Sequence, residues 1–335
     1  MGHVQTQMVT KQDSFAALDR MNPMRPHSEA NARPTDALMP ISIRGLTKRY
    51  GPLTALNDLN LDVVQGEVLG FLGLNGAGKT TTIRLLLDLL RPTSGRAFIF
   101  GHDCWTQSLA ARAKVGYLPG ELGLFPDLTG LEVLDFLAGI NREPVDKSRR
   151  QELFDRLELP HSDLRRKLRQ YSTGMKRKLG LIQALQTDPP LLILDEPTEG
   201  LDPLVQAALH QLLLELRTRG RTIFMSSHVL SEVERLCDRI GVIREGEMVL
   251  LSTVEEARRR SGRTVHIRFA QPVEPMPLPA GMSLVSREAE RWTIKVEHEV
   301  GPLLPVLAHL PVRDLEILEP ALEDVLRSFY RAAAP

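Results

Sequence analysis

Residues 68–80 read VLGFLGLNGAGKT, an apolar run followed at once by a glycine-rich loop that ends in Lys79 and Thr80. The loop matches the pattern G-x-x-x-x-G-K-[ST] in full, with a strand-like segment before it and a helical segment after it. Glycines let successive backbone N–H groups turn toward a phosphate chain, and the N-terminus of the following helix adds its positive end to the same anion. The stretch therefore predicts a strand, a phosphate-binding loop and a helix.

This loop predicts a role for its polar side chains. Lys79 is expected to reach the β and γ phosphates of a nucleotide, and Thr80 is expected to bind Mg²⁺. The alternative is a glycine-rich turn with an incidental lysine, and both flanking segments argue against it. The residues predicted to bind the nucleotide here are Gly73, Leu74, Asn75, Gly76, Ala77, Gly78, Lys79, Thr80 and Thr81.

A second motif is the apolar run at residues 191–194, which ends in two neighbouring acids, Asp195 and Glu196. A strand in this place would set Asp195 at the carboxyl end of a sheet, where open α/β sheets bind their ligands. Asp195 is therefore a predicted Mg²⁺ ligand, and Glu196 a predicted catalytic residue that orients or deprotonates a water. Paired acids after a strand also occur as ordinary solvated helix starts, but the upstream phosphate loop favours the catalytic interpretation.

Short β-rich runs alternate with helical patterns on both sides of these motifs. Further strands are expected at residues 41–43, 59–64, 115–118, 222–225 and 240–243. Helical patterns begin at Thr80, Thr129, Gly174, Pro203 and Val229. The alternation predicts an α/β domain with a largely parallel sheet over residues 39–260.

The two ends of the chain differ from this domain. Residues 1–38 have proline among polar residues and no sustained period, which predicts a disordered extension, or a start of translation at Met24 or Met39. Residues 261–335 are expected to form a small α+β domain. Apolar side chains alternate with polar ones around Ile267 and Ile294, and a helical pattern follows Pro320.

Composition excludes several classes of protein. Lys plus Arg number 42 and Asp plus Glu number 42, so no chain-wide positive field favours nucleic acid as a partner. The two cysteines lie in no metal-ligand spacing, which is typical of a reduced, cytoplasmic chain. No apolar run approaches the ~20 residues that span a bilayer, so a role at a membrane would need a partner.

Residues 171–175, YSTGM, resemble the signature motif of ATP-binding cassette (ABC) ATPases, usually Leu-Ser-Gly-Gly-Gln. Ser172 and Gly174 are kept, and the resemblance implies that they bind the nucleotide of a facing subunit. Alone, a Ser-x-Gly before a helix is an ordinary N-cap. The family's order of motifs nevertheless extends over residues 41–260, which implies an ABC-type P-loop NTPase fold with an antiparallel β part and a helical signature subdomain.

Three further residues take roles from this resemblance. Tyr50 lies where the family has an adenine-stacking aromatic, Asp202 ends a loop similar to the one after the catalytic acid, and His228 is similar to the family's switch histidine. Each match is weak alone, because a lone tyrosine near a strand is usually core and a lone histidine is more often structural.

One position departs from the family pattern. After residues 115–119 the family normally has a glutamine that touches Mg²⁺ and the water, and here that place holds Gly120, followed by Glu121. Glycine has no side chain to bind a metal. We therefore expect either that Glu121 takes this role as a metal ligand or that the loop couples to a membrane partner by another geometry.

The resemblance implies an ATP- and Mg²⁺-dependent ATPase subunit of an ABC transporter, with export favoured by the similarity of residues 320–325 to exporter ATPases. Its implied partners are a second copy or a related subunit in a head-to-tail dimer, and a separate transmembrane permease. It would then lie in the cytoplasm, peripheral on the inner face of the membrane. The alternatives are a nucleotide-sensing regulatory ABC protein with little hydrolysis, a soluble ABC ATPase outside transport, and a P-loop kinase, which the signature-like segment disfavours.

Overall fold

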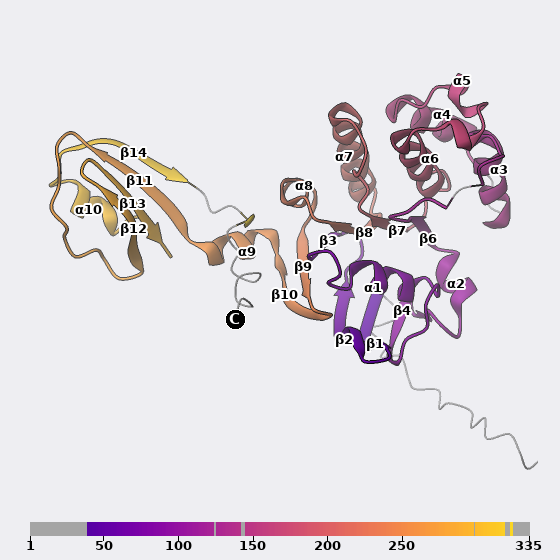
Figure 1. Ribbon diagram of the computed structural model, residues 1–335, viewed down its shortest axis with the longest axis horizontal. Coiled ribbons are helices and arrows are strands. Elements are labelled where there is room, and N and C mark those ends of the chain that lie inside the picture. Colours follow the sequence, from indigo (N-terminus) through magenta and orange to yellow (C-terminus); the bar gives the residue numbers. More distant parts are fainter. Residues whose placement is uncertain (1–38, 124, 142–144, 298, 319–321, 324–335) are drawn as a thin grey trace, which may run out of the picture.

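The computed structural model describes residues 39–123, 125–141, 145–297, 299–318 and 322–323, whose strands form three sheets (Figure 1). The predicted disordered extension at residues 1–38 lies outside the described residues. So does most of the helix predicted after Pro320, of which only Leu322 and Glu323 are described.

A six-stranded sheet forms the centre of the structure, in the order β10-β9-β3-β8-β7-β6. Its strands are β3 (Val68–Leu72), β6 (Val115–Leu118), β7 (Leu191–Asp195), β8 (Thr222–Ser227), β9 (Arg239–Arg244) and β10 (Glu247–Thr253). All pair in parallel except β10 with β9. Every residue of β3 and β7 is buried, as continuous apolar runs predict for a parallel sheet covered on both faces. The predicted α/β class is therefore confirmed.

A second, antiparallel sheet packs against one face of the central sheet. It has the order β2-β1-β4-β5 and consists of β1 (Ile41–Tyr50), β2 (Leu53–Val63), β4 (Ser94–Ile99) and β5 (His102–Asp103). Ile43 of this sheet and Phe71 and Phe224 of the central sheet belong to one fully buried cluster. Strands β1 and β2 are longer than the sequence predicts, because buried and exposed residues do not alternate regularly along them.

Helices lie on both faces of the central sheet. On the side of the antiparallel sheet, α1 (Lys79–Leu86) and α2 (Ser108–Arg112) contribute Ile83 and Ala111 to the same buried cluster. A second buried cluster lies on the other face of the central sheet. The helices that contribute to it are α3 (Gly130–Asn141), α4 (Lys147–Arg156), α5 (His161–Leu164), α6 (Thr173–Leu185), α7 (Pro203–Thr218) and α8 (Leu230–Leu236).

The position of α6 matters most for the site. Figure 1 shows α3, α4, α5 and α6 as one group above β6 and β7. Leu179 and Leu181 on α6 share a buried cluster with Leu118 and Leu194, which lie near the ends of these two strands. This packing fixes α6 over the strand ends.

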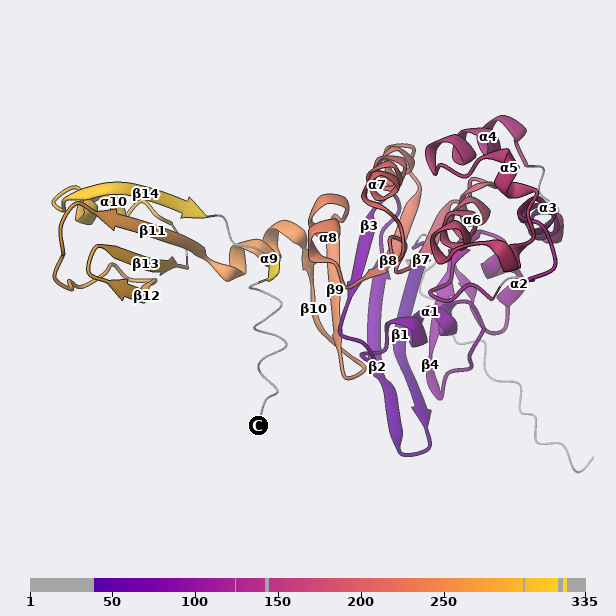
Figure 2. The same ribbon diagram turned by 45° about the horizontal axis from the view of Figure 1, so that its top comes forward.

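The third sheet has a core of its own. Its order is β12-β13-β11-β14, and it consists of β11 (Arg263–Phe269), β12 (Met282–Glu288), β13 (Arg291–Val296) and β14 (Val312–Leu318), with α10 (Leu303–Leu307) beside it. Ile267, Trp292 and Ile294 are buried in this core, as the alternation in sequence predicts. Figure 2 shows the sheet set apart from the other two and joined to them through α9 (Val254–Ser261).

Gly116 in β6 yields a stability prediction. A Cβ atom there would lie 2.1 Å from the carbonyl oxygen of Ala184 on α6, so Gly116→Ala would force helix and strand apart. Overpacking a core costs about 1–3 kcal/mol, so we expect a thermal midpoint lower by roughly 5 °C, measured by calorimetry. Gly139→Ala on α3 is the control, because its Cβ would meet nothing within 4 Å and alanine favours helix. Equal midpoints in both variants would contradict this packing.

Candidate active site

The loop between β3 and α1 turns sharply, and glycine is required where it does. Gly76 and Gly78 have φ angles of 82° and 116°, in the left-handed region that L side chains rarely adopt. A Cβ atom on Gly73 would lie 2.6 Å from the carbonyl oxygen of Ile243, so the loop also lies close against β9. The chain then enters α1 at Lys79, one residue before the predicted start.

Lys79 is buried at the start of α1, with 6% of its surface exposed. Its Nζ donates a hydrogen bond to the carbonyl oxygen of Gly73 at 2.6 Å and lies 3.6 Å from Oε1 of Glu196. Burying an ammonium is costly unless it is paired, and here a carbonyl and a carboxylate pair it. Lys79 therefore joins the predicted phosphate loop to the predicted catalytic acid.

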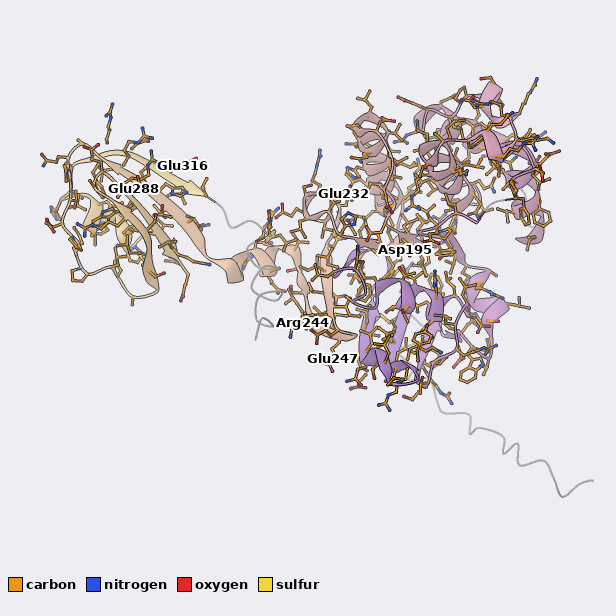
Figure 3. All side chains as sticks on the ribbon, viewed as in Figure 1. Asp195, Glu232, Arg244, Glu247, Glu288 and Glu316 are labelled. Atoms are coloured by element: carbon orange, nitrogen blue, oxygen red, sulfur yellow. The ribbon has the colours of Figure 1, made fainter. Side chains whose placement is uncertain are left out.

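Asp195 ends β7 and is 1% exposed. Its Oδ2 accepts a hydrogen bond from Oγ1 of Thr80 at 3.1 Å, so two residues far apart in sequence meet. Figure 3 shows Asp195 between the helical group and the antiparallel sheet. A carboxylate and a hydroxyl are oxygen ligands of the kind that Mg²⁺ prefers, so these residues fit the ion that the sequence predicts.

Glu196 follows in a strained conformation, with a φ of 52°. Its Oε2 lies 2.8 Å from Nδ1 of His228 and accepts a weaker hydrogen bond from the backbone N–H of His228 at 3.3 Å. With Lys79 on the other carboxylate oxygen, both oxygens of Glu196 have partners. The structure therefore brings together the two predicted catalytic residues, Glu196 and His228.

Ser226 is a site residue that the sequence analysis missed. Its Oγ donates to Oδ1 of Asp195 at 2.5 Å and accepts from the backbone N–H of Glu196 at 3.0 Å, so one buried hydroxyl holds both acids. Ser226 lies directly opposite Asp195 in the parallel pairing of β7 with β8. A polar residue at the end of a buried strand is the signal that would have found it.

A cleft of about 950 Å³ opens beside these residues. Its lining comes from Leu74, Asn75, Gly76, Gly78, Lys79, Thr80, Thr81, Gly120, Glu121, Leu122, Thr173, Lys176, Arg177, Asp195, Glu196, Glu199 and Gly200. The phosphate loop, the two acids and the start of α6 thus face one space, large enough for a nucleotide.

Comparison with known proteins agrees with this geometry. The family model for "ABC transporter" matches residues 56–199. The bacitracin transport ATP-binding protein BcrA of Enterococcus faecalis is 40% identical over 66% of this chain and 71% of its own length. The chain belongs to the ATP-binding proteins of ABC transporters. The daunorubicin resistance ATP-binding protein DrrA3 of Streptomyces coeruleorubidus is 38% identical, again over 66% of this chain and 71% of that one.

Solved structures give the same fold. The dimeric ATP-binding cassette MJ0796, bound to ADP and Pi in a post-hydrolysis state, is 25% identical with a TM-score of 0.59, covering 64% of this chain and 98% of that one. This chain therefore has the ABC ATPase fold and belongs to an ATPase family. Matches to the first three curated relatives span 64%, 71% and 75% of those proteins.

In this ABC ATPase, Ser172 of the signature-like segment and Asp202 each cap the start of a helix. Oγ of Ser172 accepts the backbone N–H of Met175 at 3.2 Å at the start of α6, and Asp202 accepts the N–H of Val205 at 3.0 Å at the start of α7. That N–H lowers the pKa of Asp202, and Lys178, 3.7 Å away, acts in the same direction.

Gly174 brings these two helix starts together. A Cβ atom on Gly174 would lie 2.9 Å from the carbonyl oxygen of Gly200, which lies in the loop before α7. A larger residue at 174 would therefore push this loop away from α6.

Of the remaining predicted site residues, Tyr50 lies outside the cleft and Glu121 lies in its wall. Tyr50 is 45% exposed at the end of β1, with Nζ of Lys48 4.9 Å from its ring centre, and it does not line the cleft. Glu121 is exposed and does line it. Within one chain the wall of the cleft also omits six other predicted site residues, which are Gly73, Ala77, Ser172, Gly174, Asp202 and His228.

Both cysteines of the chain lie among the described residues. Cys104 and Cys237 are free there, and burial raises the pKa of both thiols. The described residues contain no cluster of three or more His, Cys, Asp or Glu side chains suited to a metal ion. They also include no helix with the length and apolar character needed to cross a membrane.

Proposed function

We propose that this chain is the ATP-hydrolysing subunit of an ABC exporter, works as a head-to-tail dimer and drives a separate transmembrane permease. The observation that carries the proposal is the convergence of Lys79, Asp195 and Glu196 on one cleft at the carboxyl end of the sheet. The relatives named for bacitracin transport and daunorubicin resistance support export.

Each side chain has a chemical task in this proposal. Lys79 would bind the β and γ phosphates, for which its paired position in the loop prepares it. Thr80 and Asp195 would hold Mg²⁺, which would neutralise charge on the phosphates when bound. Glu196 would accept a proton from the attacking water, and His228 would keep its carboxylate in place at 2.8 Å.

The dimer would complete the site. Ser172 lies at the N-terminus of α6, where backbone N–H groups favour an anion, and we assign Ser172 and Gly174 to the nucleotide of the facing subunit. Asp202 starts the neighbouring helix and would face the same boundary. Tyr50, exposed at the end of β1, would stack on adenine. The dimeric relative with ADP and Pi supports this arrangement.

The proposed division of the chain follows its sheets. Residues 39–260 would form the ATPase domain and residues 261–335 an accessory domain. The sheet of the accessory domain has its own core, and Leu322 packs in the buried cluster of Leu250 and Val254 in the ATPase domain. We place the protein in the cytoplasm, held at the inner face of the membrane through the permease. No nucleic-acid partner is proposed, because positive and negative side chains balance.

A nucleotide-sensing regulatory protein is the second candidate, and Gly120 favours it, because a side chain near Mg²⁺ is missing there. Steady-state ATP hydrolysis by the purified full chain, alone and with the candidate permease in proteoliposomes, separates the two. We expect turnover that the permease and its cargo stimulate. Tight MgATP binding with no turnover in either preparation would favour the sensor.

Glu121→Ala tests the metal role proposed for Glu121. We expect the variant to hydrolyse ATP more slowly and to need more Mg²⁺ for half-maximal rate, because a cleft carboxylate can act on the ion through one of its waters. Gly120→Gln is expected to change the Mg²⁺ requirement little. ATPase rate measured against Mg²⁺ concentration checks both, with Asp127→Ala, an acid outside the cleft, as control. A Glu121→Ala curve that overlays the parent would leave Glu121 as a solvated loop acid.

A further inference from the structure

Arg177 lies in the second turn of α6 and is 4% exposed, an unusual burial for a guanidinium. Its Nη1 donates to the carbonyl oxygens of Pro119 at 2.7 Å and Gly120 at 3.1 Å. Its Nη2 donates to the carbonyl oxygens of Asp195, at 2.5 Å, and Glu196. One side chain therefore binds four backbone carbonyls.

These carbonyls belong to two separate loops. Pro119 and Gly120 follow β6, while Asp195 and Glu196 end β7 and begin the next loop, and the two strands are parallel neighbours. The planar guanidinium presents its N–H groups in a fixed fork, so the four hydrogen bonds set the distance between the loops as well as joining them. A lysine has one rotatable ammonium and would hold them less rigidly.

The charge of Arg177 also belongs to this site. Burial lowers the pKa of the guanidinium, and the carboxylates of Glu199, Asp195 and Glu196 oppose that effect. The cation is therefore stabilised in part by the acids whose backbone it binds. A neutral residue at 177 would leave both the carbonyls and the carboxylates without this cation.

Gly120 explains why such a link matters in this chain. A Cβ atom on Gly120 would lie 3.2 Å from Oδ2 of Asp195, so the position faces the candidate Mg²⁺ ligand. Glycine offers no side chain to connect the loop with that site. The connection in this structure runs through the Gly120 carbonyl and Arg177.

We propose that Arg177 is a positioning residue that ties the loop after β6 to the Asp195–Glu196 turn, in place of a side chain at position 120. Because α6 begins at the Ser172 cap, the same residue links the proposed facing-subunit contact to the catalytic acid. It also sets Glu121, the next residue along the loop, at the cleft. The inference about turnover rests on the proposed function, whereas the tie between the loops does not.

The test compares the full-length parent with Arg177→Met and Arg177→Lys. We expect hydrogen exchange to rise in peptides that cover residues 115–123 and 191–200, because both loops lose their common donor. We also expect kcat to fall at least about 10-fold in Arg177→Met, with an MgATP Kd within a few-fold of the parent by calorimetry, and an intermediate kcat in Arg177→Lys.

Arg149→Met is the matched control. Arg149 also lies on the helical group with its side chain only 15% exposed, and its Nε donates to the carbonyl oxygen of Leu185 at 3.0 Å, at the far end of α6 from the acids. The variant should lose thermal stability without changing kcat or exchange in the two loops. If Arg177→Met folds and leaves exchange in both loops unchanged, the tie is wrong.

The remaining outcomes distinguish the tie between the two loops from its effect on turnover. Raised exchange with unchanged kcat would overturn the positioning role while leaving the contact. Raised exchange together with a parent that hydrolyses no ATP would overturn the proposed function and support the tie. If Arg177→Met does not fold, Arg177→Lys is compared with the parent in the same way. Hydrogen exchange and turnover equal to those of the parent in Arg177→Lys would show that the forked guanidinium is not required.

Discussion

Glu196→Gln should bind MgATP as the parent does and hydrolyse it slower by a factor of ~10² to 10⁴, the usual effect of losing a positioned base. Glutamine keeps the size of the side chain and can still contact His228, which lies 2.8 Å from the carboxylate. It cannot accept the proton of an attacking water. We expect the variant to accumulate as an ATP-bound dimer, because hydrolysis would no longer separate the subunits.

Turnover and light scattering under saturating MgATP check this result. Glu255→Gln is the control, because it makes the same change of charge on α9, outside the cleft. It should keep turnover within a few-fold of the parent. A Glu196→Gln protein that stays monomeric with ATP, or that turns over at the parental rate, would show that the composite site is wrong for this chain.

Lys79→Ala is expected to lose most of its MgATP affinity. Hydrogen bonds to charged groups contribute about 1.5–3 kcal/mol, so the Kd should rise by roughly 10- to 100-fold or more. The fold should survive, because Nζ of Lys79 contacts the Gly73 carbonyl and Glu196, both of which belong to the site. Removing the ammonium also frees Glu196 from its cation.

Calorimetric titration with MgATP measures the change, and a thermal melt of the same sample shows whether the fold is intact. Lys114→Ala serves as control, since that lysine packs over the ring of Phe100, 5.2 Å from its centre, and lies outside the cleft. Parental affinity in Lys79→Ala would remove the basis for assigning residues 73–81 to the phosphates.

The sequence predicts the fold most accurately where local pattern is strongest. Strands β3 and β6 have the predicted bounds, because each is a short, mostly apolar run bounded by glycine, proline or polar residues. The prediction is less complete for β1 and β2. These strands are partly exposed, and the irregular pairing between them breaks the simple alternation that sequence analysis detects.

The candidate site also has a part that the sequence predicts and a part that it does not. Residues 73–80 and the pair Asp195–Glu196 are predictable, because a phosphate loop and an acid at a strand end are local motifs whose chemistry needs those residue types in that order. The contact of Thr80 with Asp195 follows from the parallel sheet, which brings the carboxyl ends of its strands to one edge. The local motifs and the sheet topology are together sufficient to predict this part of the site.

The tertiary structure alone decided the roles of Ser226 and Arg177. Ser226 binds Asp195 across 31 residues of sequence, and Arg177 reaches Pro119 across 58, so neither contact leaves a local pattern. The sequence around Ser226 and Arg177 has no motif that marks either residue. The packing of β8 beside β7 brings Ser226 to the acids, and the packing of α6 over both loops brings Arg177 to them. The sequence by itself determined which chemistry the site contains, since motifs are local, and the tertiary structure determined what holds that chemistry in place, since buried hydrogen-bond partners come from wherever the fold brings a donor.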